Sequence, residues 1–166
     1  MKVTDWLAIY GAALSTIVFA WNAFQSRPRL KVVVVFGIEG KVHGAHISVQ
    51  NRSPHTVHLS NISILYRYRK AGLKEWLSHA WEYKRIPRRL GWVYSSLSNY
   101  DVPDGCPVAL EARNAHHVLV PDAVLESVFQ NVTERKIIAV VQDKIWNSVY
   151  SNVFEYAKPR ASVSEA

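Results

Sequence analysis

"LKVVVVFGIEGKVHGAHISVQ", residues 30–50, begins with a continuous run of β-branched and other apolar side chains. Such a run is typical of a buried β-strand. The turn-like EGK at residues 39–41 ends it, and HISVQ at residues 46–50 then alternates between apolar and polar side chains. NRSPH at residues 51–55 breaks this second pattern with turn-forming residues. The stretch therefore predicts a chain that is mainly β.

Further strand signals continue toward the C-terminus. Apolar and aromatic residues alternate from residue 57 to residue 68, with one slip at residues 60–61 that predicts either a β-bulge or the meeting of two strands. HHVLV, KIIAVVQD and SVYSNVFEYA, which begin at residues 116, 136 and 148, predict three more strands. The KIWN sequence between the last two predicts a hairpin loop.

One short helix interrupts this pattern near residues 122–130. Val124, Leu125 and Val128 have helical spacing there, behind Pro121 and Asp122 at the start. The remaining pattern predicts roughly seven or eight strands with turns at sandwich-like spacing. We therefore predict a β-sandwich with one short helix.

Residues 6–24 form a stretch in which almost every side chain is apolar or small. A helix of this length spans roughly 28 Å, close to the ~30 Å hydrocarbon core of a bilayer. A cleaved signal peptide and a buried soluble helix are the alternatives. The run is longer than the apolar region of a signal peptide, and it lacks the polar stripe of a soluble helix. We therefore predict a transmembrane anchor over residues 1–26.

Basic residues follow this span at once, in a juxtamembrane segment at residues 27–31. Arg27, Arg29 and Lys31 are predicted to contact the membrane surface, where each gains about 1 kcal/mol from anionic lipid. Positive flanks stay on the cytoplasmic side, so we expect the N-terminus outside and the C-terminal domain in the cytoplasm, at the inner membrane. Cys106 is the only cysteine, so no intramolecular disulfide forms, as expected in a reducing compartment.

The rest of the chain has the length of one domain, predicted at residues 32–157 and followed by a disordered tail at residues 158–166. The N-terminal span, the basic RPRLKV, and the segments HISVQNRSPHTVHLSNISI and IIAVVQDKIWNSVYSN together resemble small bacterial single-pass proteins with a cytoplasmic immunoglobulin-like β-sandwich. The resemblance implies a fold and a membrane address. It carries no site residues and no activity.

Motifs for chemistry are sparse. Residues three apart or adjacent in a strand point to opposite faces, so we expect none of three histidine pairs to chelate a metal: His43 with His46, His55 with His58, and His116 with His117. Cys106 has no sequence neighbour that would lower its pKa or act as a base. The sequence contains no phosphate-binding glycine loop, zinc-protease motif or nucleophile elbow. We therefore expect a non-catalytic protein without a cofactor or a metal.

The basic residues are concentrated in the first half of the chain. Residues 1–90 hold fourteen Lys and Arg against four Asp and Glu, whereas residues 91–166 hold six against nine. Beyond the juxtamembrane segment, the sequence gives a candidate anion-binding set of Arg67, Arg69, Lys84, Arg85, Arg88 and Arg89. The favoured alternative is that Arg67 and Arg69 form a solvated stripe on an edge strand, which prevents edge-to-edge aggregation.

Aromatic residues interleave with the second part of this basic set. They are Trp76, Trp81, Tyr83, Trp92 and Tyr94. Nucleic acid bases stack on such side chains, but aromatic residues of a sandwich more often pack in its core or at its rim. Nucleic acid and nucleotide are therefore the less favoured ligands.

These features together predict a membrane-anchored protein whose cytoplasmic β-sandwich is an interaction or scaffold module. The expected partner is another membrane protein or a second copy of the chain, and Gly11 and Ser15 have the small-xxx-small spacing that lets two spans approach closely. The alternative is a membrane-tethered sensor or effector that binds an anionic ligand through the candidate anion-binding set, as in phage defence or exclusion. That ligand would be a nucleotide, a nucleic acid or a lipid headgroup.

Overall fold

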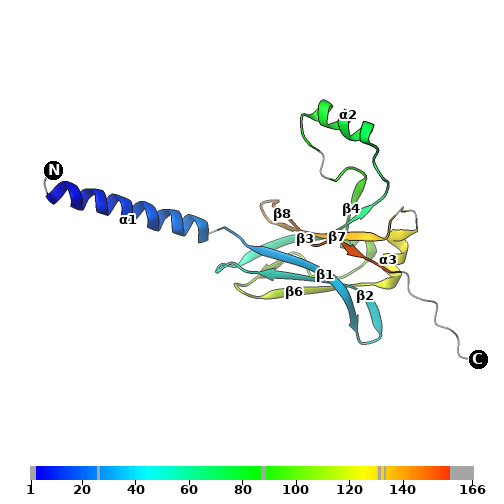
Figure 1. Ribbon diagram of the computed structural model, residues 1–166. Coiled ribbons are helices and arrows are strands. Elements are labelled where there is room, and N and C mark those ends of the chain that lie inside the picture. Colours follow the sequence, from blue (N-terminus) through cyan, green and yellow to red (C-terminus); the bar gives the residue numbers. More distant parts are fainter. Residues whose placement is uncertain (1–2, 26, 87–88, 131, 133, 158–166) are drawn as a thin grey trace, which may run out of the picture.

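A computed structural model describes residues 3–25, 27–86, 89–130, 132 and 134–157 of the 166-residue chain. It shows a mainly β body and one long N-terminal helix that leaves it (Figure 1). The helices are α1 (Val3–Gln25), α2 (Leu73–Tyr83), α3 (Asp122–Phe129) and the 3-10 helix η1 (Leu97–Tyr100). The strands are β1 (Leu30–Glu39), β2 (Val42–Asn51), β3 (Val57–Arg67), β4 (Trp92–Ser96), β5 (Val108–Leu110), β6 (Ala115–Pro121), β7 (Lys136–Asp143), β8 (Ser148–Tyr150) and β9 (Phe154–Glu155).

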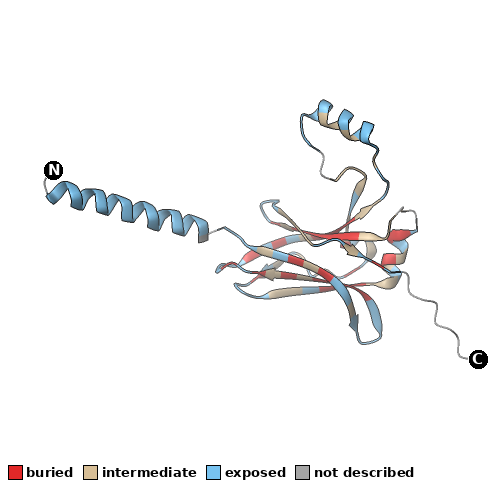
Figure 2. Cartoon of the chain, viewed as in Figure 1, coloured by how far each residue is buried: buried red, intermediate tan, exposed pale blue. Residues whose placement is uncertain are grey.

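Helix α1 contains the whole predicted span and extends it at both ends. Among the described residues it is the one helix with the length and apolar composition to cross a membrane. Two hydroxyl groups in its middle do not need solvent, because Ser15 and Thr16 donate to the Ala12 carbonyl oxygen at 3.0 and 2.8 Å. The side chains of residues 3–24 are exposed in the isolated chain, so no part of the β body covers this apolar surface (Figure 2).

Within the described residues the strands form two antiparallel sheets. The smaller sheet has the order β1-β2-β6, and the larger has the order β4-β3-β7-β8 with β5 on β3 and β9 on β7. Strands β1 and β2 pair along their full length, from Leu30 opposite Asn51 to Glu39 opposite Val42. Gly40 has a φ of 61°, which a glycine adopts without strain, and it lies in the turn predicted at residues 39–41.

The core lies between the two sheets. Strand β2 contributes alternate side chains, with Ala45, Ile47 and Val49 fully buried, and the facing sheet contributes residues such as Ile62 and Ile64. Figure 2 shows the buried residues concentrated on the sheets and on α3. Helix α3 lies within the predicted range 122–130, and its residues Leu125, Val128 and Phe129 join the same core.

The structure settles two features that the sequence pattern left open or gave differently. The slip at residues 60–61 is a β-bulge within one strand, because the register of β3 against β7 shifts between Leu59 and Asn61. Residues 148–157, predicted as one strand, form the two short strands β8 and β9. The chain leaves the sheet between them because Asn152 bonds through its side chain to the backbone of Val34, with N–O distances of 3.0 and 3.1 Å.

The hairpin loop predicted at residues 144–147 is confirmed between β7 and β8. One oxygen of the Asp143 carboxylate accepts hydrogen bonds from the backbone N–H groups of Ile145 and Asn147, at 3.0 and 2.8 Å. These hydrogen bonds from the backbone to the Asp143 side chain hold the turn in place, although the loop contains no glycine.

The edge-strand interpretation of the first basic cluster is wrong. Strand β3 lies between β4 and β7, and Arg67 is its last residue, paired with Trp92 of β4. Arg69 lies beyond the strand. The strand is buried on both of its faces, with Ile62 and Ile64 in the core between the sheets and Leu65 in a separate apolar cluster, as expected for a strand in the interior of a sheet. The tail predicted at residues 158–166 lies outside the described residues.

Candidate interaction surfaces

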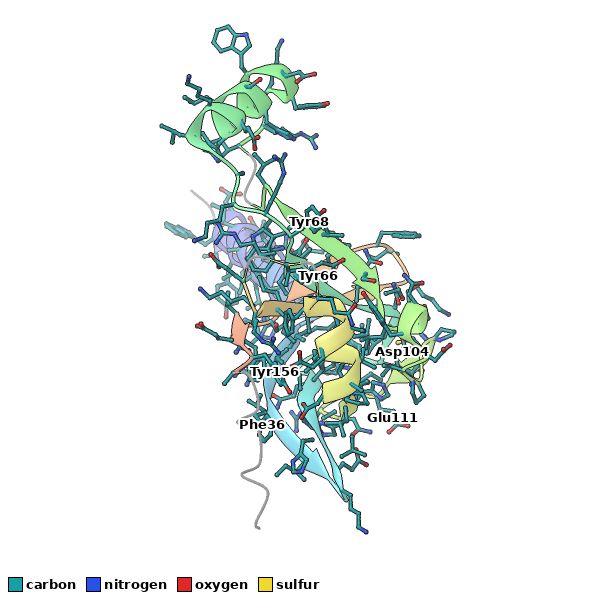
Figure 3. All side chains as sticks on the ribbon, turned by 90° about the vertical axis from the view of Figure 1, so that its right-hand side faces the viewer. Phe36, Tyr66, Tyr68, Asp104, Glu111 and Tyr156 are labelled. Carbon is teal, nitrogen blue, oxygen red and sulfur yellow. The ribbon has the colours of Figure 1, made fainter. Side chains whose placement is uncertain are left out.

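Helix α2 was not predicted from the sequence, and it stands clear of the β body both in Figure 1 and in the perpendicular view of Figure 3. None of its eleven residues, all of them described, is buried. Leu73, Leu77 and Trp81 are four residues apart, so they lie on one face of the helix, and their exposed fractions are 77, 54 and 89%. Helix α2 is therefore an amphipathic helix that exposes these three apolar side chains.

The loops that carry α2 are clamped where they leave the sheet. The backbone N–H groups of Tyr68 and Arg69 both donate to the Gly91 carbonyl oxygen, at 3.0 and 3.2 Å. Gly91 has a φ of 82°, and a Cβ there would lie 2.2 Å from the Arg69 carbonyl oxygen, so only glycine fits this crossing. Arg69 also forms an ion pair with Glu75 of α2, at 2.9 Å. We call residues 68–91 the arm.

The first half of the candidate anion-binding set is engaged within the chain. The Glu134 carboxylate forms ion pairs with three basic side chains. The N–O distances are 3.2 Å to Arg67, 3.2 Å to Lys70 and 3.5 Å to Lys136. The hydrogen bond from Lys70, together with these positive charges, lowers the pKa of the Glu134 carboxyl. Arg67 therefore shares the single negative charge of Glu134 with two lysines, and Arg69 is paired with Glu75, so both guanidinium groups already have a carboxylate partner.

The other residues of the candidate anion-binding set do not lie together. The Arg89 guanidinium lies over the Tyr150 ring, 3.3 Å from its centroid, and the Tyr150 hydroxyl is 2.7 Å from that of Tyr94. Tyr150 itself packs against a second apolar cluster, formed by Leu65, Ile138 and Val140 on the outer face of the larger sheet. Lys84 and Arg85 are exposed at the end of α2, and Arg88 lies outside the described residues. The described members of the set do not converge on one site.

The aromatic residues near this set also separate. Trp81 and Tyr83 are exposed on the arm, and Trp76 is half-buried there. Trp92 packs against the second apolar cluster, next to Tyr150, and Tyr94 lies on the same strand. These five rings therefore do not form one stacking surface for bases.

The adjacent histidines His116 and His117 of β6 have different surroundings, as the strand pattern predicts, and Cys106 is half-buried. The Nε2 atom of His116 is 2.7 Å from the Asp104 carbonyl oxygen, whereas the neighbouring His117 stacks on His46 with ring centroids 5.1 Å apart. Burial raises the pKa of the half-buried Cys106 thiol to about 12, and the Asp104 charge adds to this. Among the described residues, no three His, Cys, Asp or Glu side chains are close enough to hold a metal ion.

The predicted membrane-contact residues lie at the C-terminal end of α1. The guanidinium of Arg27 is 5.5 Å from the centroid of the Phe24 ring, and Arg29 donates to the Phe24 carbonyl oxygen at 3.5 Å. Cations at this end of a helix also interact favourably with its dipole. Lys31 is exposed on β1.

The predicted helix-contact residues are both on the exposed surface of α1. A Cβ at Gly11 would meet nothing within 4 Å, and Ser15 is one turn away. This part of α1 is therefore open to close approach by another helix.

Comparison of the chain with models of protein families, with curated proteins and with solved structures gave no match. The class of the protein accordingly rests on its own features, which are an apolar N-terminal helix and a mainly β body of two packed sheets.

Proposed function

We propose that this protein is a membrane-anchored, non-catalytic interaction module in which the arm binds a partner protein. The observation that carries the proposal is the exposed apolar surface of α2, with Leu73, Leu77 and Trp81 exposed together. Exposed apolar faces of this kind are characteristic of docking surfaces, and amphipathic helices commonly bind in a groove of their partner. The hydrogen bonds from Tyr68 and Arg69 to Gly91 fix the base of the arm on the β body.

The proposed anchor is α1, oriented with its N-terminus outside and the β body in the cytoplasm. Its length and composition support a crossing of the inner membrane, and the basic segment with Arg27, Arg29 and Lys31 supports this orientation. We expect the partner to be another membrane protein or a second copy of the chain, with Gly11 and Ser15 as contacts between spans.

The β body is proposed to be an immunoglobulin-like sandwich. The order β1-β2-β6 corresponds to strands A, B and E of that fold, and the order β4-β3-β7-β8 corresponds to C′, C, F and G. Sandwiches of this kind are common in proteins that act by binding, and this supports the interaction role by analogy of fold alone.

The alternative function, an anionic ligand bound by the candidate anion-binding set, has weaker support. Arg67 and Arg69 are paired with carboxylates, and Arg89 lies on a tyrosine ring. A ligand there would have to displace these contacts, whereas Leu73, Leu77 and Trp81 of α2 are already exposed.

Photocrosslinking in cells tests the proposed partner. A benzophenone amino acid is placed at Trp81 of the arm, and the matched control places it at Trp146, which is 77% exposed on the hairpin between β7 and β8. We expect a discrete crosslinked band from position 81 and none at that size from position 146. The proposal is wrong if position 81 gives no adduct, or if both positions give the same adducts.

A further inference from the structure

Three arginines from separate parts of the sequence meet at the end of the β body from which α1 leaves. Arg29 precedes β1, Arg52 follows β2, and Arg113 lies in the loop before β6. The strand register brings them together, because Leu30 is opposite Asn51 and Gln50 is opposite Ala115. We call Arg29, Arg52 and Arg113 the arginine cluster.

Backbone hydrogen bonds fix the spacing of this cluster. The Arg52 N–H donates to the Arg29 carbonyl oxygen at 2.7 Å, and the Asn51 N–H donates to the Asn114 carbonyl oxygen at 2.9 Å. Asn51 is only 1% exposed, and its amide nitrogen is 2.8 Å from the His55 carbonyl oxygen and 3.0 Å from that of Leu110. The loops that carry Arg52 and Arg113 are therefore held by a buried polar network.

The cluster lines a cavity of about 260 Å³ between the end of α1 and the β body. Trp21 and Phe24 of α1 supply the apolar part of its wall, and the three arginines and Pro54 supply the rest. A second cavity of about 440 Å³ adjoins it and shares Arg52 and Arg113. The arrangement combines aromatic rings with several guanidinium groups around a concave surface.

No member of the cluster forms an ion pair with a carboxylate among the residues that the structure describes. Arg67, Arg69 and Arg135 each have such a partner, with Arg135 bound to Glu126. Three neighbouring positive charges without a counter-ion create a local positive potential that attracts an anion. Guanidinium groups bind phosphate oxygens through paired hydrogen bonds, so phosphate is the anion that they suit best.

We infer that the arginine cluster binds the phosphate of an anionic lipid headgroup where α1 emerges from the bilayer. This inference rests on the proposed membrane anchorage. The apolar span ends next to Trp21 and Phe24, and each headgroup region is roughly 5–8 Å thick, so the cluster lies at headgroup depth. A lipid is favoured over a free phosphate compound because Trp21 and Phe24 in the same cavity would contact the acyl chains of the lipid.

The test measures thermal unfolding of the full-length protein in a neutral detergent. Short-chain phosphatidylglycerol, phosphatidylcholine of the same chain length and inorganic phosphate are added separately. We expect phosphatidylglycerol to raise the unfolding temperature by several degrees at saturation, because a ligand of the folded state stabilises it. Phosphatidylcholine and inorganic phosphate should raise the temperature much less.

Two double variants with the same loss of charge locate the effect. Arg52→Gln with Arg113→Asn removes two members of the cluster, and asparagine suits the φ of 59° at position 113. Lys84→Gln with Arg85→Gln removes two exposed cations of the arm. The shift should be lost in the first variant and kept in the second. If the first double variant is unfolded in the absence of lipid, the single variant Arg52→Gln replaces it. Arg52 does not have a positive φ, so this substitution does not strain the backbone.

Each other outcome overturns the inference. An equal shift with phosphatidylcholine would mean general lipid binding, and an equal shift with inorganic phosphate would make the cluster a site for free phosphate. Equal loss in both double variants would mean that net charge alone acts. Membrane fractionation with alkaline extraction is done in parallel. If the wild-type chain is extracted as a soluble protein, the proposed anchorage fails; if it stays in the membrane but phosphatidylglycerol has no effect, only the headgroup site fails.

Discussion

Cys106 shows how the surroundings of one side chain set its reactivity. Its thiol is half-buried against the core, and its backbone N–H donates to the Asp104 carboxylate at 3.0 Å. Burial, and then the Asp104 charge, raise the pKa from 9.0 to about 12. The thiolate is the reactive form of cysteine, so this thiol is much less reactive in the folded protein than in the unfolded chain.

Alkylation kinetics test this environment. At pH 8 we expect native Cys106 to react with iodoacetamide roughly a hundred-fold to a thousand-fold more slowly than in urea, because its thiolate fraction is smaller. Unfolding releases a proton between pH 9 and pH 12, so the free energy of unfolding should fall as the pH rises through that range. Mass spectrometry of the alkylated protein gives the rates. Equal rates in the native and unfolded states would contradict the buried environment.

The arginine cluster illustrates why residue positions in the site escape prediction from sequence. Arg29 was predicted as a membrane contact from its place after the span, but Arg52 and Arg113 lie far from it in the sequence. Their meeting depends on the pairing of β2 with β1 and with β6. Strand register is set by the whole core, and no local pattern around Arg52 or Arg113 reveals it.

Strands were easier to predict than the short elements between them. Strands β1 and β7 contain runs rich in β-branched residues, and β2 and β3 alternate apolar with polar residues, so local preference and burial act in the same direction in these strands. The break between β8 and β9 depends on Asn152 and its partner Val34, which is 118 residues away. Helix α2 had a local signal, the spacing of Leu73, Leu77 and Trp81 behind Gly72, that the aromatic and basic residues around it obscured.

The helices α2 and α3 should respond very differently to the same substitution. Leu77→Ala on α2 removes an exposed side chain, so we expect the free energy of unfolding to change by no more than about 0.5 kcal/mol. Leu125→Ala on α3 removes a fully buried side chain and should cost about 2–5 kcal/mol. Chemical unfolding of the full chain in detergent, followed by tryptophan fluorescence, gives both values. A large loss for Leu77→Ala would mean that the arm packs on the β body.

At the scale of the whole molecule, the β body begins directly after the apolar helix α1. Only residues 26–29 separate α1 from β1, and an extended chain covers at most about 3.3–3.6 Å per residue. If α1 crosses a bilayer, the first strand therefore begins within roughly 18 Å of its end. The arm leaves the β body away from α1 in Figure 1, and this leaves the apolar face of α2 available to a protein.

The sidedness of the β body tests the central claim most directly. Because Cys106 reacts slowly, it is replaced by serine, and single cysteines are placed at the exposed positions Thr4 and Lys41, on either side of the span. Spheroplasts are treated with a membrane-impermeant maleimide before and after lysis. The account predicts that Thr4→Cys is labelled in intact spheroplasts and that Lys41→Cys is labelled only after lysis. Labelling of Lys41→Cys in intact spheroplasts, or recovery of the protein in the soluble fraction, would contradict it.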